Sequence, residues 1–341
     1  MTTTWPLRAA PQAPAGATAA APPPAAAGAS DADYATALGV PPAALEAPGL
    51  ELDQEEVAAA ALLRFHFYAT RPEPAVFPRV ALRLLDLLLD EELEVGELCR
   101  QVELDGALAG AVLARANAAA GRALDPVHTV PHAVTRLGLS EVARVAASTA
   151  LRALYDERAH QGYGAFVPVW PVLFQHAVVS GRLAAELARG RRDASPELAF
   201  TAGLLHDTGL AVALRSLTAL TLDGTLPLRE PASALRLLAQ VHLELGLEVV
   251  RAWRLPPRLV EVVALHHQPS LPAEPALEAV HLVRVASALD LLLAAPQANP
   301  GAAREAVEGA RALGGSPAWL SAAVARRHDA VAWTQRCFAL A

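Results

Sequence analysis

Apolar residues recur along the chain at the three-to-four residue spacing of amphipathic helices, and no segment alternates strictly between apolar and polar positions. Pro196, Pro257 and Pro317 each stand where the first turn of a helix tolerates proline. The pattern therefore predicts an all-α protein. The predicted helices span residues 53–63, 80–89, 94–102, 106–119, 130–137, 140–155, 171–189, 196–216, 232–253, 257–266, 277–293, 302–312 and 317–338.

The pattern also predicts how the chain is divided. The first 50 or so residues are rich in alanine, proline and glycine. Proline interrupts backbone hydrogen bonding, and alanine buries too little area to offset the entropy of ordering, so we expect a disordered tail over 1–52. A stretch rich in glycine and aromatic residues near 160–169 then separates two helical lobes, over 53–160 and 161–294. Residues 295–341 form a C-terminal helical extension.

Composition narrows the class of protein. Hydrophobic residues make up 53% of the chain and aromatic residues 5%, which favours helices over sheets. The net charge is −7 and no basic stripe is present, which argues against nucleic acid as a partner. Charged residues or proline interrupt every apolar stretch before the roughly 20 residues of a membrane span. Cys99 and Cys337 are far apart and lie in helical patterns, so we expect reduced thiols and a cytoplasmic location.

The strongest candidate for chemistry is the pair His206-Asp207, in the middle of the predicted helix 196–216. Adjacent histidine and aspartate supply a nitrogen and an oxygen ligand, as a divalent metal site needs. Buried histidine and aspartate cost free energy unless they are paired or bound to metal. We therefore expect convergence on one polar site, with scattered placement as the alternative. The candidate metal ligands are His176, His206, Asp207, His242, His266 and His267.

Several short motifs occur in an order and spacing that resemble a known family. They are Phe77-Pro78, Ala114-Arg115-Ala116-Asn117, Thr129-Val130-Pro131-His132-Ala133-Val134, Leu204-Leu205-His206-Asp207-Thr208-Gly209, Trp253-Arg254-Leu255-Pro256 and Ala264-Leu265-His266-His267-Gln268-Pro269. From about residue 75 to 293 the chain resembles an HDOD domain, a bacterial signalling output module related to the HD-superfamily phosphohydrolases. The resemblance implies a two-lobed helical fold and a metal pocket formed by the candidate ligands.

The chain departs from the pattern of the catalytic relatives at three places. Ser287 occupies the position of their final metal-binding aspartate, and Leu210 that of a common lysine. Ser270 follows Pro269 where cyclic-dinucleotide phosphodiesterases carry a Gly-Tyr-Pro stretch. Asp290, three residues after Ser287, lies close enough on a helix to replace the lost carboxylate in part.

These departures favour a non-catalytic signalling module that acts by protein interaction or ligand sensing through a degenerate pocket. Two divalent ions carry four positive charges, whereas Asp207 supplies one negative charge, so we expect no cofactor or a single divalent metal such as Zn, Fe or Mn. No residue is assigned a catalytic role, and we expect a signalling protein as partner. The alternative is a metal-dependent phosphohydrolase acting on a nucleotide or cyclic dinucleotide.

Asn117 is a further candidate, outside the histidine group. It could make a polar contact at an interaction surface. Its alternative role is structural, as a side chain near a helix end that satisfies neighbouring backbone groups.

Overall fold

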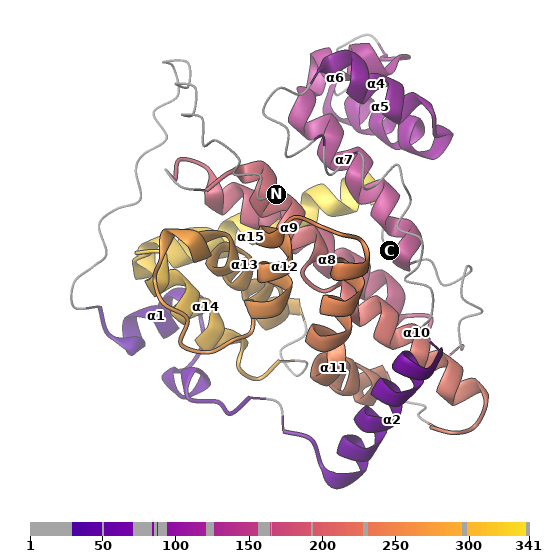
Figure 1. The fold of residues 1–341 in the computed structure, drawn as a ribbon. Coiled ribbons are helices and arrows are strands. Elements are labelled where there is room, and N and C mark those ends of the chain that lie inside the picture. The colour runs from indigo at the N-terminus through magenta and orange to yellow at the C-terminus, as the bar shows by residue number, and fades with distance from the viewer. Residues whose placement is uncertain are drawn as a thin grey trace, which may run out of the picture.

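Helices form every regular element that the structure describes, which confirms the all-α prediction (Figure 1). The structure is a computed structural model, and it describes residues 29–49, 51–70, 84, 87, 94–120, 126–155, 164, 166–191, 194–227, 231–294 and 299–338. Within these ranges no helix has both the length and the apolar character of a membrane span.

Within the described residues, the N-terminal lobe contains four helices that lie together at one end of the molecule (Figure 1). They are α4 (Val95–Glu103), α5 (Gly106–Ala120), α6 (Val130–Leu137) and α7 (Leu139–Arg152). Thr129 caps α6 through a hydrogen bond from the backbone N–H of His132. Gly138, with a φ of 82°, separates α6 from α7. Helix α7 runs from this lobe to the rest of the protein, and the short 3-10 helix η3 (Ala153–Tyr155) follows it.

The second lobe contains α8, in which 15 of 20 residues are buried. Its elements are α8 (Val169–Ala188), α9 (Pro196–Leu205), α10 (Thr208–Leu222), α11 (Pro231–Ala252), α12 (Pro257–Leu265), the 3-10 helix η5 (Pro275–Leu277) and α13 (Glu278–Ala294). Glycines allow α8 and α9 to touch backbone to backbone, since a Cβ added to Gly203 would lie 2.7 Å from Cα of Gly181.

The C-terminal helices α14 (Ala302–Ala312) and α15 (Pro317–Phe338) pack on this lobe. Helix α14 covers α13, and α15 contacts both α8 and α5. Trp333 of α15 is 2% exposed, and its Nε1 donates a hydrogen bond to Glu141 of α7 at 2.6 Å. The extension is thus in contact with both lobes.

The prediction of a disordered tail over 1–52 is wrong for the part that contains residues 31–45. Residues 1–28 lie outside the described part of the chain, but α1 (Asp31–Leu38) and the 3-10 helix η1 (Pro42–Leu45) are ordered. Ser30 and Asp33 form a capping box that starts α1. The buried Tyr34 donates from its hydroxyl to the carbonyl oxygen of Gly315 at 2.8 Å, which fixes α1 against the C-terminal helices. The prediction was based on the alanine and proline content of the segment and gave no weight to Ser30, Asp33 and Tyr34.

Helix α2 (Gln54–Thr70) packs against α10 and α11 of the second lobe, whereas we predicted it as part of the N-terminal lobe over 53–160. Glu56 accepts hydrogen bonds from Arg236 at 2.8 Å, and Arg64 donates to Glu244 at 2.8 Å. The predicted helix 80–89 lies outside the described residues, apart from the buried Leu84 and Leu87.

Replacing Tyr34 with phenylalanine tests the docking of α1. The change leaves the carbonyl of Gly315 without its buried donor, so we expect the free energy of unfolding to fall by about 1–2 kcal/mol. Denaturant titration of the full chain measures this. Tyr68→Phe is the control, because its hydroxyl bonds to Glu244 at an exposed position, and it should change stability less. Equal effects of the two substitutions would contradict the docking of α1.

Candidate metal centre

The pair His206-Asp207 lies at a break between α9 and α10, not in the middle of one helix as predicted. Asp207 has φ −109° and ψ 23°, outside the helical range, and α10 starts again at Thr208. The chain turns here against α11, where a Cβ on Gly209 would lie only 1.9 Å from the carbonyl oxygen of His242. The backbones of α10 and α11 therefore meet beside the pair, a contact that only glycine permits.

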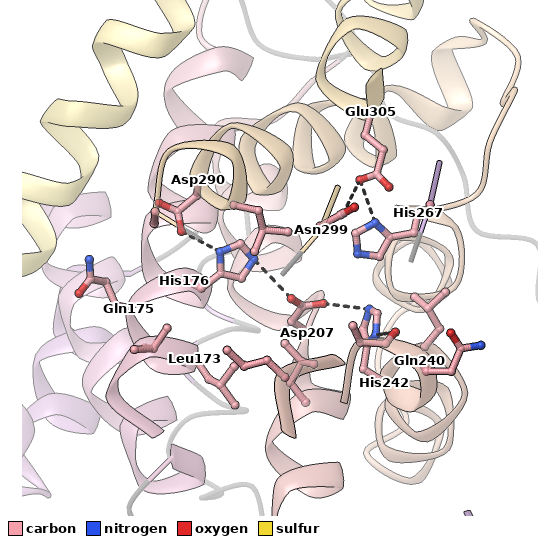
Figure 2. Close-up of a pocket in the computed structure, with 18 residues that line it drawn as sticks. Leu173, Gln175, His176, Asp207, Gln240, His242, His267, Asp290, Asn299 and Glu305 are labelled. Atoms are coloured by element: carbon pink, nitrogen blue, oxygen red, sulfur yellow. Dashed lines mark hydrogen bonds and ion pairs between the residues drawn. The ribbon is translucent and has the colours of Figure 1, made fainter. Parts of the chain in front are cut away.

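The six candidate ligands converge on one buried cluster around Asp207. Figure 2 shows Asp207 between His176 and His242, with His267 nearby. Oδ2 of Asp207 lies 3.4 Å from Nε2 of His176 and 3.3 Å from Nε2 of His206. Its other oxygen, Oδ1, lies 3.4 Å from Nε2 of His242 and 3.3 Å from Nε2 of His266. Asp207 is 4% exposed, so these contacts form away from solvent.

Every histidine of the cluster is held through Nδ1. Three bond to backbone carbonyl oxygens: His206 to Gly203 at 2.8 Å, His242 to Ala239 at 2.7 Å, and His266 to Val262 at 3.0 Å. The other two bond to carboxylates, His176 to Asp290 at 2.7 Å and His267 to Glu305 at 3.0 Å. Since a carbonyl oxygen can only accept, Nδ1 carries a proton in the first three, and in the neutral form of such a ring Nε2 carries a lone pair.

These lone pairs face a carboxylate, which is an unfavourable arrangement without a cation. Burial lowers the pKa of His242 to about 4, and burial together with His267 lowers that of His266 well below its usual value. Both rings are therefore neutral near pH 7. Their Nε2 atoms, that of His206 and Oδ1 of Asp207 have no hydrogen-bond partner among the described residues. A cation in contact with these atoms would satisfy them all.

The pKa values of Asp207 and His176 fit the same arrangement. Burial would raise the pKa of Asp207, but positive charge on the surrounding imidazoles, those of His206, His242 and His176 in their protonated forms, lowers it well below the usual value. Burial would likewise lower the pKa of His176, but contacts with Asp207 and Asp290 raise it to about 10. His176 is therefore protonated where no metal ion competes for its Nε2.

Two groups of side chains could each hold a metal ion, and Asp207 belongs to both. One contains Asp207, His242, His266 and His267, and the other contains His176, His206 and Asp207. The ligand atoms within each group lie within 4.8 Å of one another. Three imidazoles and one carboxylate form a set that suits Zn, Fe or Mn, and the Nδ1 acceptors supply the outer contacts that orient metal-binding histidines. The first group is therefore the more complete site.

Asp290 does not face Asp207 as a replacement ligand. Its Oδ1 accepts hydrogen bonds from Nε and Nη2 of Arg327 at 2.9 and 2.8 Å, and its Oδ2 bonds to Nδ1 of His176. Ser287 lies on the inner side, with Oγ 3.3 Å from Nε2 of His176. The carboxylate of Asp290 thus orients His176 through Nδ1, and the neutral hydroxyl of Ser287 lies beside Nε2.

Glu305 and Arg327 support the cluster, and sequence reasoning missed both. Glu305 on α14 accepts from His267 at 3.0 Å and from the side-chain amide of Asn299 at 3.3 Å. Arg327 on α15 fixes Asp290. Both come from the C-terminal extension, and no local motif marks them, because their partners lie 38 and 37 residues away in the chain.

Asn117 lies apart from the cluster, in α5 of the N-terminal lobe. Its side-chain amide donates to the carbonyl oxygen of Val127 at 3.0 Å and accepts from the backbone N–H of Val127 at 2.7 Å. These bonds fit the structural alternative, and its role at an interaction surface stays a prediction.

A cavity of about 420 Å³ opens onto the cluster. Apolar side chains including Leu173, Leu210 and Leu291 form much of its wall, and Asp207, Asp290 and Glu305 supply its carboxylates. No lysine or arginine is among the described residues that line it. The cavity therefore suits a ligand with an apolar body better than one with several negative charges.

The chain is similar to one protein family in sequence and to several solved structures in fold. The model of the HDOD domain family matches residues 75–269. No curated protein matches the chain. Among solved structures, the chain is similar to a candidate metal-dependent phosphohydrolase from Shewanella amazonensis, with 18% identity, coverage of 83% of this chain and 100% of that chain, and a TM-score of 0.61. It is also similar to an HDOD domain protein with unknown function from Geobacter sulfurreducens, with 21% identity, coverage of 82% of this chain and 98% of that chain, and a TM-score of 0.57. A candidate signal transduction protein from Marinobacter aquaeolei has 21% identity, coverage of 91% of this chain and 65% of that chain, and a TM-score of 0.53. At these identities the likeness concerns the fold.

Gly209→Ala tests the contact that shapes the site. The added methyl group would meet backbone atoms of His242 and Gly246, so we expect a loss of about 1–3 kcal/mol in the free energy of unfolding. Gly110→Ala is the control, since an added Cβ meets nothing within 4 Å there and the exposed helix should gain slightly in stability. Unfolding curves that respond alike to both changes would disprove the close approach of α10 and α11.

Asp207→Ala tests the cluster itself. Removing the carboxylate leaves buried imidazoles without their shared partner, and we expect a loss on the order of 1–3 kcal/mol in unfolding free energy. Chemical denaturation of the purified chain measures it, with the exposed Glu274→Ala as the control for loss of one negative charge. A variant as stable as the unaltered protein would mean that the cluster is not assembled around Asp207.

Proposed function

The chain belongs to the HDOD domain family, and from this premise we propose that it is a non-catalytic signalling module that senses a ligand through a metal-containing pocket. The group of Asp207, His242, His266 and His267 would hold one divalent ion. The orphaned buried Nε2 atoms are the observation that supports an ion here. When bound, such an ion supplies a Lewis-acidic centre at the floor of the cavity.

The residues of the chain itself have positioning roles in this proposal. The backbone carbonyl oxygens of Gly203, Ala239 and Val262 and the carboxylate of Glu305 orient the histidines. The apolar wall excludes water from the ligand. A ligand seated there would contact α8, α10, α11 and α13 at once, because all four contribute to the lining, so its binding can change how these helices pack. The partner would be a signalling protein whose binding depends on how these helices pack.

One observation carries the non-catalytic assignment: the cavity that opens onto the cluster has carboxylates and no lysine or arginine among its described lining residues. A phosphorylated substrate brings negative charge, and phosphoryl-transfer sites neutralise it with metal ions and cationic side chains. Here Asp207 is the one carboxylate shared by the two metal-binding groups, and Ser287 is neutral. The charge of the site thus favours sensing over phosphate ester hydrolysis.

A metal-dependent phosphohydrolase is the competing function. The observation in its favour is that Asp207 belongs to both groups, as a carboxylate bridging two ions would. Metal content and turnover measured on one sample separate the two functions. We expect about one divalent ion per chain and no hydrolysis of phosphate mono- or diesters with Mn, Zn or Fe added. Turnover that disappears in Asp207→Ala would establish the enzyme instead.

Restoring a carboxylate beside His176 should strengthen metal binding. Ser287→Asp places a charged oxygen near Nε2 of His176, and an added carboxylate ligand should tighten Mn, Zn or Fe binding tenfold or more, about 1.4 kcal/mol. Metal titration of the unaltered chain and the variant measures the change, with Ser287→Asn as the neutral control. Equal affinities of the Asp and Asn variants would mean that His176 and Asp207 do not form a metal-binding group.

A further inference from the structure

A second polar region lies where the N-terminal lobe meets α8 and α15, away from the histidine cluster. Two cavities of about 390 and 310 Å³ adjoin there, since both are lined by Arg115 of α5 and Arg182 of α8. Neither shares a lining residue with the cavity over Asp207. We call this region the arginine cleft. Its arginines are Arg115, Arg136, Arg144, Arg182, Arg189, Arg326 and Arg336.

Positive charge is concentrated in the arginine cleft. The seven arginines meet four carboxylates, those of Glu141, Glu186 and Asp329 in the lining and that of Glu197 next to Arg144. Among the described residues of the cleft, three positive charges are thus in excess, in a chain whose net charge is −7 and whose 28 basic residues are all arginine. Such a local reversal of the overall charge is the electrostatic signature of an anion site.

The carboxylates present are shared between guanidinium groups. Glu141 lies 3.2 Å from Arg115 and 2.7 Å from Arg182. Glu186 lies 3.0 Å from Arg182 and 2.9 Å from Arg189. Since each guanidinium has five N–H donors, this sharing leaves donors of the cleft for a further acceptor.

Arg144 is the deepest of these arginines, at 3% exposure. Its Nη2 bonds to Glu197 at 3.1 Å, while its Nε has no hydrogen-bond partner among the described residues. Burial lowers its pKa, and the positive charges of Arg182 and Arg189 act in the same direction. The carboxylates of Glu197 and Glu141 oppose these effects. With an unpartnered Nε and two cationic neighbours, this buried charge is still incompletely compensated, and an anion in the cleft would lower its free energy.

The start of α7 adds to the same site. Gly138, Leu139 and Ser140 line the larger cavity, so the first turn of this 14-residue helix opens onto the arginines. The first N–H groups of a helix have no partner within it and can donate to an anion, whereas the dipole of α6, which ends at Leu137 in the same lining, offsets that of α7. Helix N–H groups and guanidinium groups together are a frequent combination in phosphate sites.

We propose that the arginine cleft binds a small phosphoryl-bearing anion: phosphate, diphosphate or a phosphate ester. Planar guanidinium groups match the oxygens of a phosphoryl group with paired hydrogen bonds. The concave form of the two cavities fits a small molecule, whereas a protein segment would need a longer surface. Trp333 is buried and lies 5.1 Å from the guanidinium of Arg182, so it is not available to stack on a base.

Titration calorimetry of the full metal-containing chain with pyrophosphate tests the proposal, with orthophosphate and AMP as separate arms that distinguish a bare anion from an ester. The test variant is Arg136→Gln/Arg189→Gln, which removes two charges from the rim of the cleft and leaves buried Arg144 in place. The matched control is Arg251→Gln/Arg258→Gln, two exposed arginines outside the cleft. Thermal unfolding verifies that both double variants fold.

We expect the unaltered chain and the control to bind pyrophosphate alike, and the rim variant to bind at least about tenfold more weakly. Binding should persist in Asp207→Ala, so that it is independent of the proposed metal. No binding at millimolar concentrations of any arm, or equal binding by the rim variant, would overturn the proposal. Loss in Asp207→Ala alone would assign the anion to the histidine cluster. If the chain bound a phosphopeptide but not pyrophosphate, the ligand would be a protein, and the proposal of a small anion would be overturned as well.

Discussion

One buried carboxylate, that of Asp207, determines how the second lobe is built. It lies among four imidazoles at 3.3–3.4 Å, at 4% exposure, where an uncompensated charge would be very costly. The imidazoles must therefore be held in fixed orientations by their Nδ1 atoms, and the helices that carry them must approach closely. The glycine contacts between α8 and α9 and between α10 and α11 allow that approach. Packing and polar chemistry are thus parts of one arrangement.

The same requirement explains why the C-terminal helices belong with the lobe. A histidine whose Nε2 faces the cluster needs a hydrogen-bond acceptor at Nδ1. For His176 and His267 these acceptors are the carboxylates of Asp290 on α13 and Glu305 on α14. Those carboxylates are buried too, and Asp290 is in turn held by Arg327 of α15. Burial would raise the pKa of Asp290, but His176 and Arg327 lower it. Each buried charge is therefore balanced by the next, outward from Asp207 to α15.

The helices and the candidate ligands could be predicted from the sequence because both leave local signals. Apolar periodicity marks each helix, and His206-Asp207 stands out within an apolar segment. The break at Asp207 was not predicted, since the close approach of Gly209 to His242 on α11 is a contact between distant segments that leaves no local signal. Glu305 and Arg327 were missed because exposed and buried carboxylates or arginines look alike in a sequence. Helix α1 was missed because few residues, chiefly Tyr34, hold it.

The two polar regions of the protein differ in charge, and this difference bears on function. The polar residues that line the cavity over Asp207 are chiefly carboxylates and imidazoles, whereas those of the arginine cleft are chiefly arginines. Helix α8 carries both His176 and Arg182, and α15 carries both Arg327 and Trp333. A phosphoryl group is electrostatically favoured at the arginines and not at the carboxylates. The proposed phosphate site and the proposed metal site are therefore formed by different residues, since the cavities share no lining residue.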